Sequence, residues 1–339
     1  MATNNFGANT TALEVAQAFK DQIRGKNVLI TGTNPRGLGA ATARAIASES
    51  PALLILTYRT KEKADQVVAE LSAAYPDVKI ETLHLDLAST ASVRAAAKEL
   101  SSKISHLDIL INNAGVMSVQ DLTLTKEGVE MHFATNHVGH FLFTNLIMGK
   151  IIAASKKAQP GSTRIVMLSG GWHQFSPVRF DDLNFEGKPI PEDQQPDKAY
   201  LAKFGHPTDN SYIPEVAYAQ SKTANILFAT YLTEHLYKKH GILSFAVNPG
   251  GILTEIARFL PQSTLDRLVG MDIVDKTEET GTSTTMAAAF DPNLKAESSR
   301  YLHDCNPTPP APYADDQELA EKLWKISEEI VGEKFALDF

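Results

Sequence analysis

Residues 28–40 read VLITGTNPRGLGA: an apolar run of strand length leads through glycines into a segment of helical composition. Glycines permit a tight turn and let the backbone come close to a pyrophosphate, which the positive N-terminus of the following helix stabilises. The stretch therefore predicts a strand–loop–helix unit that binds a dinucleotide, with Gly32, Gly37 and Gly39 in its loop.

Strand-like and helix-like segments alternate beyond this unit. Compact apolar runs lie at Val28–Ile30, Leu53–Leu56, Ile80–Leu83, Ile109–Ile111, Ile165–Leu168 and Ser244–Val247. Helix-compatible segments separate them, at Ala40–Ser48, Lys61–Ala74, Ser89–Leu100, Val129–Ala154 and Ala219–Lys239. Strands that are apolar throughout, rather than at every second residue, indicate a parallel sheet covered on both faces. We expect an α/β fold: a Rossmann-type, doubly wound parallel sheet flanked by helices.

The chain has 339 residues, and we assign those beyond the sheet to three segments of a single domain. A capping-box pattern at Thr11 and Glu14 precedes apolar residues at four-residue steps and predicts an N-terminal helix over 11–23. Residues 186–216 are rich in proline, so this insertion cannot be one regular element. Residues 276–339 form a C-terminal extension.

Composition limits the functions that the chain can have. Lys and Arg number 32 against 40 Asp and Glu, so the formal net charge is −8, and nucleic-acid binding, which needs a dense basic face, is not expected. The first ten residues are polar and uncharged, and no apolar stretch approaches the roughly 20 residues of a membrane helix. A single cysteine excludes an intrachain disulfide and fits a reducing compartment. We therefore expect a cytoplasmic protein without a membrane partner.

Basic residues occur where a dinucleotide-binding fold distinguishes its two common cofactors. A fold that selects NAD usually has an acid at the end of the second strand, where it binds the ribose 2′-hydroxyl. This chain has Arg59 at that position and Arg36 inside the glycine loop. Two cations suit a 2′-phosphate, so we expect NADP(H) as the cofactor.

Further motifs follow the glycine loop in a set order. They are Asp86 after the third strand, Asn112-Asn113-Ala114-Gly115 after the fourth, Asn136, the pair Tyr218-x-x-x-Lys222, and Asn248-Pro-Gly-Gly-Ile252-Leu-Thr254 after the sixth. With these motifs, residues 25–255 resemble the short-chain dehydrogenase/reductase family. The tail, with Leu323-Trp324 and Ser327, is similar to the retinol-dehydrogenase and WW-domain-oxidoreductase branch.

The chemistry of Tyr218 and Lys222 follows from their spacing. They are one helical turn apart, so both side chains project from the same helix face. A free phenol, with a pKa near 10, is a poor acid or base at neutral pH, but a nearby ammonium and an oxidised nicotinamide both favour the phenolate. Tyr218 can then give a proton to a carbonyl oxygen while a cofactor supplies hydride.

The resemblance implies further roles. Lys222 would also bind the nicotinamide ribose, Asn136 would hold a water in a proton relay, and Asp86 would contact the adenine. The remaining cofactor contacts would come from Leu38, Asn113, Ala114, Gly115, Ile252 and Thr254. The resemblance also implies a homo-oligomer.

The chain departs from the family pattern at two places. Four residues instead of three separate Gly32 from Gly37, with Pro35 as the extra one, so cofactor contacts are expected to shift. The fifth strand ends in Ser169-Gly170, where the family has two serines and uses the second in catalysis. Three outcomes follow: Ser169 turns into the site, another donor such as His173 or a residue of 186–216 replaces the serine, or the carbonyl-reducing activity is weakened or repurposed.

Other residues allow more than one interpretation. His132, His137 and His140 cluster without acidic or cysteine ligands, so packing and hydrogen bonding are expected rather than a metal site. Trp172 and Phe175 either line an apolar substrate pocket or pack beneath the insertion. Residues 252–275 form either a mobile segment over the substrate or a buried pair of helices.

The leading hypothesis is an NADP(H)-dependent oxidoreductase that interconverts a carbonyl and an alcohol on an apolar small molecule, with Tyr218, Lys222, Asn136 and Ser169 as its catalytic residues. The glycine at position 170 motivates a second hypothesis, a non-redox isomerase, cyclase or dehydratase that uses Tyr218 as acid and base. A redox-silent NADP-binding sensor is a third, and the retained proton-relay residues argue against it.

Overall fold

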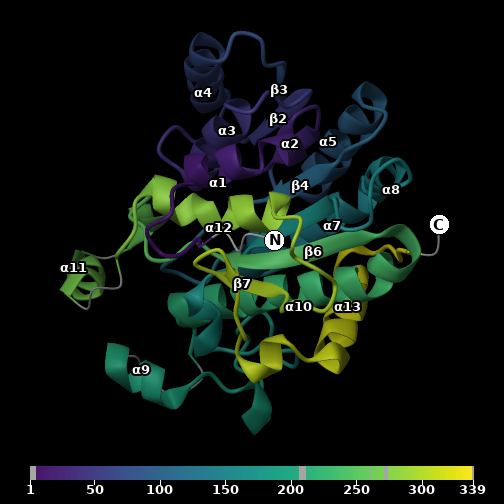
Figure 1. The fold of residues 1–339 in the computed structure, drawn as a ribbon. Helices are drawn as coiled ribbons and strands as arrows, with labels where there is room; N and C mark the ends of the chain where they lie inside the picture. Colours follow the sequence, from purple (N-terminus) through teal and green to yellow (C-terminus); the bar gives the residue numbers. More distant parts are fainter. Residues whose placement is uncertain (1–4, 206–210, 261, 271–273, 338–339) are drawn as a thin grey trace.

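The computed structural model describes residues 5–205, 211–260, 262–270 and 274–337. At its centre is one eight-stranded sheet with the strand order β3-β2-β1-β4-β5-β6-β7-β8 (Figure 1). All neighbouring strands pair in parallel except β8, which pairs antiparallel with β7. The strands are β1 (Asn27–Ile30), β2 (Leu53–Tyr58), β3 (Ile80–His84), β4 (Ile109–Asn112), β5 (Thr163–Leu168), β6 (Ile242–Asn248), β7 (Tyr301–His303) and β8 (Asn306–Pro307).

The direction of winding reverses between β1 and β4. The chain proceeds from β1 outward through β2 and β3, then returns to place β4 on the other side of β1 and continues outward through β5, β6 and β7. This confirms the doubly wound α/β fold. In such sheets the ligand crevice lies outside the carboxyl ends of the strands at the reversal.

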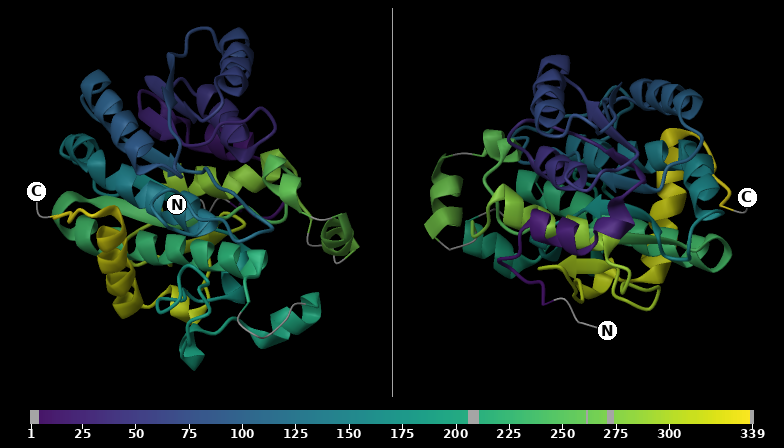
Figure 2. Two further views of the ribbon diagram at one scale, coloured as in Figure 1. Left: turned by 180° about the vertical axis from the view of Figure 1, so that it is seen from behind. Right: turned by 45° about the horizontal axis from the view of Figure 1, so that its top comes forward.

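Helices cover both faces of the sheet (Figures 1 and 2). Within β1, Leu29 packs into one core while Val28 and Ile30 pack into the other, and all three are fully buried. A strand buried on both sides needs apolar residues at every position, which explains its continuous pattern. One face carries α1 (Ala12–Ala18), α3 (Leu38–Ala47), α4 (Lys61–Ala74) and α12 (Glu278–Phe290), and the other carries α5 (Thr90–Lys103), α7 (Gly139–Leu146), α8 (Met148–Ser155), α10 (Pro214–His240) and α13 (Gln317–Val331).

The six predicted strands are all present, and the pattern missed β7 and β8. These two are too short for an apolar run, and β8 is exposed. Asp304 and Cys305 connect them in a tight turn, in which both residues have positive φ, 49° and 64°. The two strands are identified by their pairing with β6 and with each other, which only the tertiary structure provides.

The prediction of one continuous helix over Val129–Ala154 is wrong. It consists of α6 (Met131–Phe133), the π-helical turn η1 (Ala134–Val138), α7 and α8. The segments Met131–Leu146 and Met148–Ser155 meet at a bend of 59°. Among the described residues no single helix has the length and hydropathy of a membrane span, and this bent pair has them only when both halves are taken together.

The three additional segments have different structures. The predicted capping box is present, with hydrogen bonds exchanged between Thr11 and Glu14, but the helix is split into α1 and α2 (Lys20–Ile23). The insertion holds the 3₁₀ turn η3 (Glu192–Gln194), α9 (Lys198–Phe204) and the start of α10, while its residues 206–210 lie outside the described residues. The C-terminal extension contributes α12, β7, β8 and α13 to the packed structure. The assignment of all three to a single domain stays a prediction.

Candidate active site

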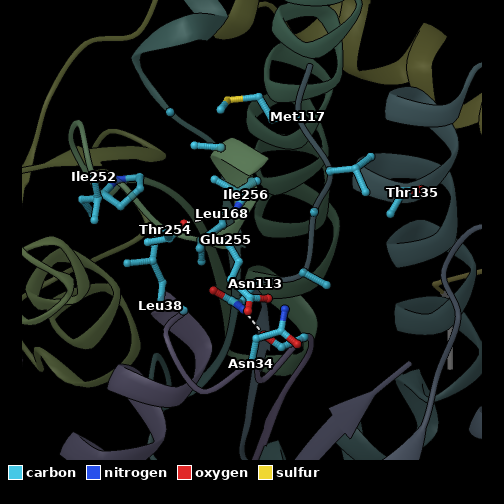
Figure 3. Close-up of a pocket in the computed structure, with 18 of the residues that line it drawn as sticks. Asn34, Leu38, Asn113, Met117, Thr135, Leu168, Ile252, Thr254, Glu255 and Ile256 are labelled. Atoms are coloured by element: carbon cyan, nitrogen blue, oxygen red, sulfur yellow. Dashed lines mark hydrogen bonds between the residues drawn. The ribbon is translucent and has the colours of Figure 1, made fainter. Parts of the chain in front are cut away.

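A cavity of about 290 Å³ opens at the carboxyl ends of the central strands, at the position that the doubly wound fold predicts (Figure 3). Its lining extends from the glycine loop to α10 and to the 3₁₀ helix η4 (Glu255–Phe259). Three predicted site residues, Arg36, Gly39 and Asn136, lie outside this lining. The predicted residues that do line it are Gly32, Gly37, Leu38, Arg59, Asp86, Asn113, Ala114, Gly115, Ser169, Tyr218, Lys222, Ile252 and Thr254.

The glycine loop is built from backbone segments that lie too close together to admit side chains. Gly32 has a φ of 71°, and a Cβ on it would lie 2.7 Å from the Cβ of Ala114. A Cβ on Gly39 would lie 2.5 Å from the carbonyl oxygen of Gly32. Asn113 stabilises this approach, because its Nδ2 donates to the carbonyl oxygens of Thr31 and Gly32 at 2.7 and 2.9 Å. Gly39 therefore packs beneath the loop.

A β-turn accommodates the extra residue Pro35. The N–H of Gly37 donates to the carbonyl oxygen of Asn34 at 3.1 Å, and Pro35 follows Asn34, where the fixed φ of proline suits the turn. Arg36, at the next position, is exposed and outside the cavity, because the turn carries it to the surface. Of the two arginines assigned to a 2′-phosphate, the structure brings Arg59 alone into the lining.

A directed chain of hydrogen bonds links the glycine loop to the π-helical turn. The N–H of Ala114 donates to Thr31 Oγ1 at 3.0 Å, which leaves the Thr31 hydroxyl to donate to His140 Nε2 at 2.9 Å. His140 Nδ1 in turn lies 3.0 Å from the carbonyl oxygen of Asn136, which can only accept. These partners define His140 as the neutral Nδ1–H tautomer. Burial lowers the pKa of His140 to about 4, in agreement with a neutral ring.

The side chain of Asn136 is committed to other parts of the protein. Its Oδ1 accepts from the N–H of Val116 at 2.8 Å, and its Nδ2 donates to the Val116 carbonyl oxygen and to Ser221 Oγ at 3.0 and 2.9 Å. Asn136 thereby holds the loop after β4 against α10. The side-chain groups of Asn136 are thus all used within the protein, and its implied role in a water relay stays a prediction.

Tyr218 and Lys222 lie one turn apart on the buried side of α10. Tyr218 is 7% exposed and Lys222 is 2% exposed, and Lys222 Nζ lies 5.2 Å from the centre of the phenol ring. The ammonium donates to the carbonyl oxygen of Leu168 at 3.0 Å, whereas no residue that the structure describes hydrogen-bonds the Tyr218 hydroxyl. Burial disfavours the charged form of each group, so it raises the pKa of Tyr218 and lowers the pKa of Lys222 to about 7.

The side-chain hydrogen bonds of Ser169 and His173, two of the candidates named for the missing serine, go to the protein backbone. Ser169 Oγ donates to the carbonyl oxygen of Lys222 at 2.8 Å. In His173, Nδ1 donates to the Gly170 carbonyl oxygen at 2.8 Å and Nε2 accepts from the N–H of Ala311 at 3.0 Å. A Cβ on Gly170 would have nothing within 4 Å. The structure therefore leaves room at position 170 for the serine side chain that the family has there, but this chain has glycine.

Aromatic side chains form the wall beyond Tyr218. Trp172 lines the cavity, meets the Tyr218 ring edge-on at 6.2 Å and stacks on Phe175 with ring centroids 4.6 Å apart. Phe175 packs on the other side against Tyr200 of α9, with the two ring centroids 3.9 Å apart. Trp172 therefore lines the cavity, as the first interpretation of this pair predicted. Phe175 packs against the insertion, as the second predicted.

The described part of residues 252–275 has exposed apolar side chains, and its η4 and α11 do not form the buried helix pair that was one of the two alternatives. Leu253 is 48% exposed, and Val269 in α11 (Gln262–Gly270) is 51% exposed. Figures 1 and 2 show α9 and α11 projecting from the body of the molecule. Pro261 and residues 271–273 of this segment lie outside the described residues.

The clustered histidines are fully buried and hydrogen-bonded. His132 Nδ1 lies 2.7 Å from a carboxylate oxygen of Glu130, and His137 Nε2 lies 2.8 Å from Ser327 Oγ on α13. Within the described ranges, no group of three or more potential ligands could hold a metal ion. The three histidines are buried and hydrogen-bonded, which is the packing role expected from the sequence.

Two charged residues of the cavity were missed by sequence reasoning. Lys63 on α4 and Glu255 at the start of η4 both line it and form an ion pair. Lys63 lies four residues after Arg59 in the same basic segment, which is a signal that could have found it, whereas Glu255 is 192 residues from Lys63 in sequence. Asp86 was placed correctly at the cavity and does not cap α5, because Ser89 does so.

Comparisons with known proteins show the family to which the chain belongs. A family model described as short chain dehydrogenase matches residues 26–171. Retinol dehydrogenase 14 of Mus musculus is 34% identical over 324 residues, covering 91% of this chain and 87% of that protein. Oxidoreductase fscI of Fusarium equiseti is 42% identical over 247 residues, covering 73% of this chain and 95% of that protein.

Solved structures share the fold. An uncharacterised protein from Mycobacterium paratuberculosis has a TM-score of 0.68 at 27% identity, covering 93% of this chain and 96% of that one. An NADPH-bound carbonyl reductase from chicken fatty liver has a TM-score of 0.57 at 20% identity, covering 85% and 94%. The fold and the site define a dinucleotide-binding α/β oxidoreductase. The chain belongs to the short-chain dehydrogenase/reductase family, near its retinol dehydrogenase branch, and is an oxidoreductase of the carbonyl/alcohol class.

The hydroxyl of Thr31 can be tested at constant side-chain shape. Thr31→Val leaves the half-buried N–H of Ala114 without its acceptor and the buried His140 Nε2 without its donor. We expect the free energy of unfolding to fall by about 2–4 kcal/mol, measured by urea unfolding with circular dichroism. Thr31→Ser keeps the hydroxyl and should cost about 1 kcal/mol for the lost methyl group. Equal costs for the two substitutions would show that the hydrogen-bonded chain contributes nothing.

Proposed function

We propose that the chain is an NADP(H)-dependent oxidoreductase that interconverts a carbonyl and an alcohol on an apolar small molecule, with Tyr218 as the group that gives and takes the proton. The proximity of Tyr218 and Lys222 in one cavity with the glycine loop is the observation that carries the proposal. Relatives named as retinol dehydrogenases support an apolar alcohol or aldehyde as substrate.

The residues of the cavity fit a nicotinamide dinucleotide. The floor is backbone at Gly32 and Gly115, where a Cβ would lie 2.7 and 3.1 Å from neighbouring atoms. Arg59 is the cation that we assign to a ribose 2′-phosphate, and Asp86 with Asn113 would contact the adenosine. When bound, the nicotinamide would supply or accept the hydride.

In carbonyl reduction, Tyr218 acts as the acid. Its burial raises the phenol pKa, so the proton is retained until it passes to the carbonyl oxygen of the substrate. The resulting phenolate is in low-dielectric surroundings, where the ammonium of Lys222 stabilises it more strongly than in water. Lys222 keeps this position because Leu168 accepts its hydrogen bond. In alcohol oxidation the same groups act in reverse, with Tyr218 as the base.

The substrate end of the cavity is apolar. Met117, Trp172, Ile256 and Leu260 are among the apolar residues that line the cavity. An apolar molecule that covers these side chains gains about 25 cal/mol for each Å² removed from water. Trp172 also presents a ring next to Tyr218, so a planar or unsaturated group beside the reactive carbonyl would pack well there.

The absence of a serine hydroxyl at Gly170 favours a second candidate, a non-redox isomerase, cyclase or dehydratase that uses Tyr218 as acid and base. The two candidates differ in stoichiometry. Oxidation of one NADPH for each product molecule supports the oxidoreductase, whereas product formed with the absorbance of reduced nicotinamide unchanged supports the second candidate.

Tyr218→Phe tests the proton-transfer role directly, because it removes the hydroxyl and keeps the ring. With NADPH and a series of apolar aldehydes and ketones, we expect kcat to fall about 10³-fold, while the Kd for NADPH changes less than about twofold. Tyr200→Phe, outside the cavity lining, is the matched control and should retain full activity. A Tyr218→Phe enzyme as fast as the wild type would exclude the mechanism.

The pH dependence follows from Lys222. Burial lowers its pKa to about 7, so its ammonium is present below that pH and is lost as the pH rises through it. We therefore expect kcat/KM for carbonyl reduction to fall about tenfold per unit above about pH 7. His140, with a pKa of about 4, stays neutral over this range. Lys222→Met should have a low kcat/KM at every pH, without the fall above about pH 7. If the variant still shows that fall, the fall belongs to a group other than Lys222.

Gly170→Ser tests the departure from the family pattern. The extended φ of 164° and the open space around Gly170 admit a serine without strain. A hydroxyl at this position would donate to the substrate oxygen, so kcat for carbonyl reduction should rise at least about tenfold. Gly170→Ala is the matched control, since it adds the Cβ alone. If serine and alanine have the same effect, another donor already serves the substrate oxygen.

A further inference from the structure

The wall of the cavity that follows β5 is held from behind by a buried histidine. His173 lies in the 3₁₀ helix η2 (Gly171–Phe175), is fully buried and lies outside the cavity lining. Its Nδ1 donates to the Gly170 carbonyl oxygen at 2.8 Å, and its backbone N–H donates to the same oxygen at 3.3 Å. Gly170 and Trp172, which precede His173, both line the cavity. His173 therefore fixes two residues of the wall without reaching the cavity itself.

The other side of His173 is held by the C-terminal extension, residues 276–339. His173 Nε2 accepts from the N–H of Ala311 at 3.0 Å, and the His173 carbonyl oxygen accepts from the Tyr313 hydroxyl at 2.8 Å. The imidazole ring also packs against Tyr301 of β7, with ring centroids 4.8 Å apart. Burial lowers the pKa of His173, so Nε2 stays unprotonated and remains an acceptor. The extension is thus connected to the cavity wall through one side chain.

The wall needs this support because it contains two consecutive glycines. Glycine has the greatest backbone freedom, and Gly170 and Gly171 carry no side chains that packing could hold. A Cβ on Gly170 would have nothing within 4 Å, so no neighbouring group restrains the chain there by contact. In the described part of the chain, the hydrogen bonds to the Gly170 carbonyl oxygen come from His173. Hydrogen bonding therefore replaces packing at this position.

A displacement of η2 would also reach the proposed proton donor. Trp172 is bonded directly to His173, and its ring meets the Tyr218 ring edge-on at 6.2 Å. A shift of about 1 Å in a group that orients the substrate can lower the rate by about 10²-fold. The position of His173 therefore determines how a substrate lies between the indole and the phenol.

We propose that His173 is a positioning residue for carbonyl reduction, which connects the C-terminal extension to Gly170 and Trp172 and so holds the substrate wall against Tyr218. This inference rests on the proposed function. It gives the extension a part in the site, although Ala311 and Tyr313 lie outside the cavity lining. A planar substrate depends most on this wall, because it packs on the Trp172 ring.

Substitutions can remove the contacts of His173 separately. Tyr313→Phe removes one contact from the extension and leaves the buried ring in place. His173→Gln retains an acceptor near Nε2 and loses the donor to Gly170, whereas His173→Asn retains a donor near Nδ1 and loses the acceptor for Ala311.

Ser327→Ala is the matched control. Ser327 Oγ, also in the extension, lies 2.8 Å from Nε2 of the buried His137, and both residues lie outside the cavity lining. The control thus removes a buried hydrogen bond between the extension and another histidine. Thermal unfolding of all variants measures the loss of stability, which should be similar for Tyr313→Phe and Ser327→Ala.

The first measurement requires neither substrate nor cofactor. The tryptophans of the chain are Trp172 and Trp324, so Trp324→Phe leaves Trp172 as the single fluorescent reporter of the wall. In this background, His173→Gln and Tyr313→Phe should make Trp172 fluorescence easier to quench with acrylamide, because the wall is less firmly held. Ser327→Ala should leave the quenching unchanged.

The second measurement is NADPH-dependent reduction of cinnamaldehyde, which is planar, and hexanal, which is saturated. His173→Gln should lower kcat/KM for cinnamaldehyde about tenfold, and His173→Asn and Tyr313→Phe about threefold. The losses with hexanal should be smaller, so the ratio of the two kcat/KM values falls. The Kd for NADPH should change less than about twofold. Ser327→Ala should leave the ratio unchanged.

Equal effects of Tyr313→Phe and Ser327→Ala on the quenching and on the ratio would show that the extension contributes stability alone, and would overturn the proposal. Wild-type quenching in both His173→Gln and Tyr313→Phe would overturn it as well. A wild type that reduces neither aldehyde while the quenching changes as expected would support the connection through His173 and count against the proposed function.

Discussion

The close approach of the glycine loop to the loop after β4 is the constraint on which the site depends. At Gly32 and Ala114 the two backbones leave no room for a further side chain. The hydroxyl of Thr31 links them to the rest of the site, because it accepts from the N–H of Ala114 and donates to His140 Nε2. His140 also hydrogen-bonds the backbone carbonyl of Asn136. The side chain of Asn136 in turn hydrogen-bonds Val116 and Ser221 of α10. The floor of the cavity and the helix that carries Tyr218 are thus parts of one hydrogen-bonded network, which positions one relative to the other.

Burial has a second consequence, which is electrostatic. The same packing that orders α10 places Tyr218 and Lys222 in low-dielectric surroundings, where each group favours its neutral form. A neutral phenol is suited to donate a proton, and a lysine that titrates near neutrality responds to small changes in its surroundings. Ser169 takes part in this packing, because its Oγ donates to the carbonyl oxygen of Lys222, and its catalytic role stays a prediction. The site therefore has Tyr218, the proton donor that we propose, in place, with open space where the family has a serine hydroxyl.

Local patterns predicted the elements that local physics determines. The six central strands are apolar at every residue because both of their faces are buried, and the capping box at Thr11 is formed by neighbours in sequence. The pattern missed β7, β8 and the π-helical turn at Asn136, which depend on contacts with distant segments. Arg36 was assigned to the cofactor by its place in the loop, but the turn at Pro35 carries it to the surface. Lys63 and Glu255 come from segments that no local pattern joins.

The amino-acid sequence by itself determined the fold class, the position of the glycine loop and the pairing of Tyr218 with Lys222, because strand burial, glycine spacing and helical periodicity are short-range properties. The tertiary structure decided which of these side chains face the cavity, and what each is free to do. It committed Ser169, His173 and the amide of Asn136 to the protein's own backbone and side chains, and it left the space beside Gly170 open. Those outcomes depend on hydrogen bonds between residues far apart in the chain, and such contacts exist only after the sheet and its helices have packed.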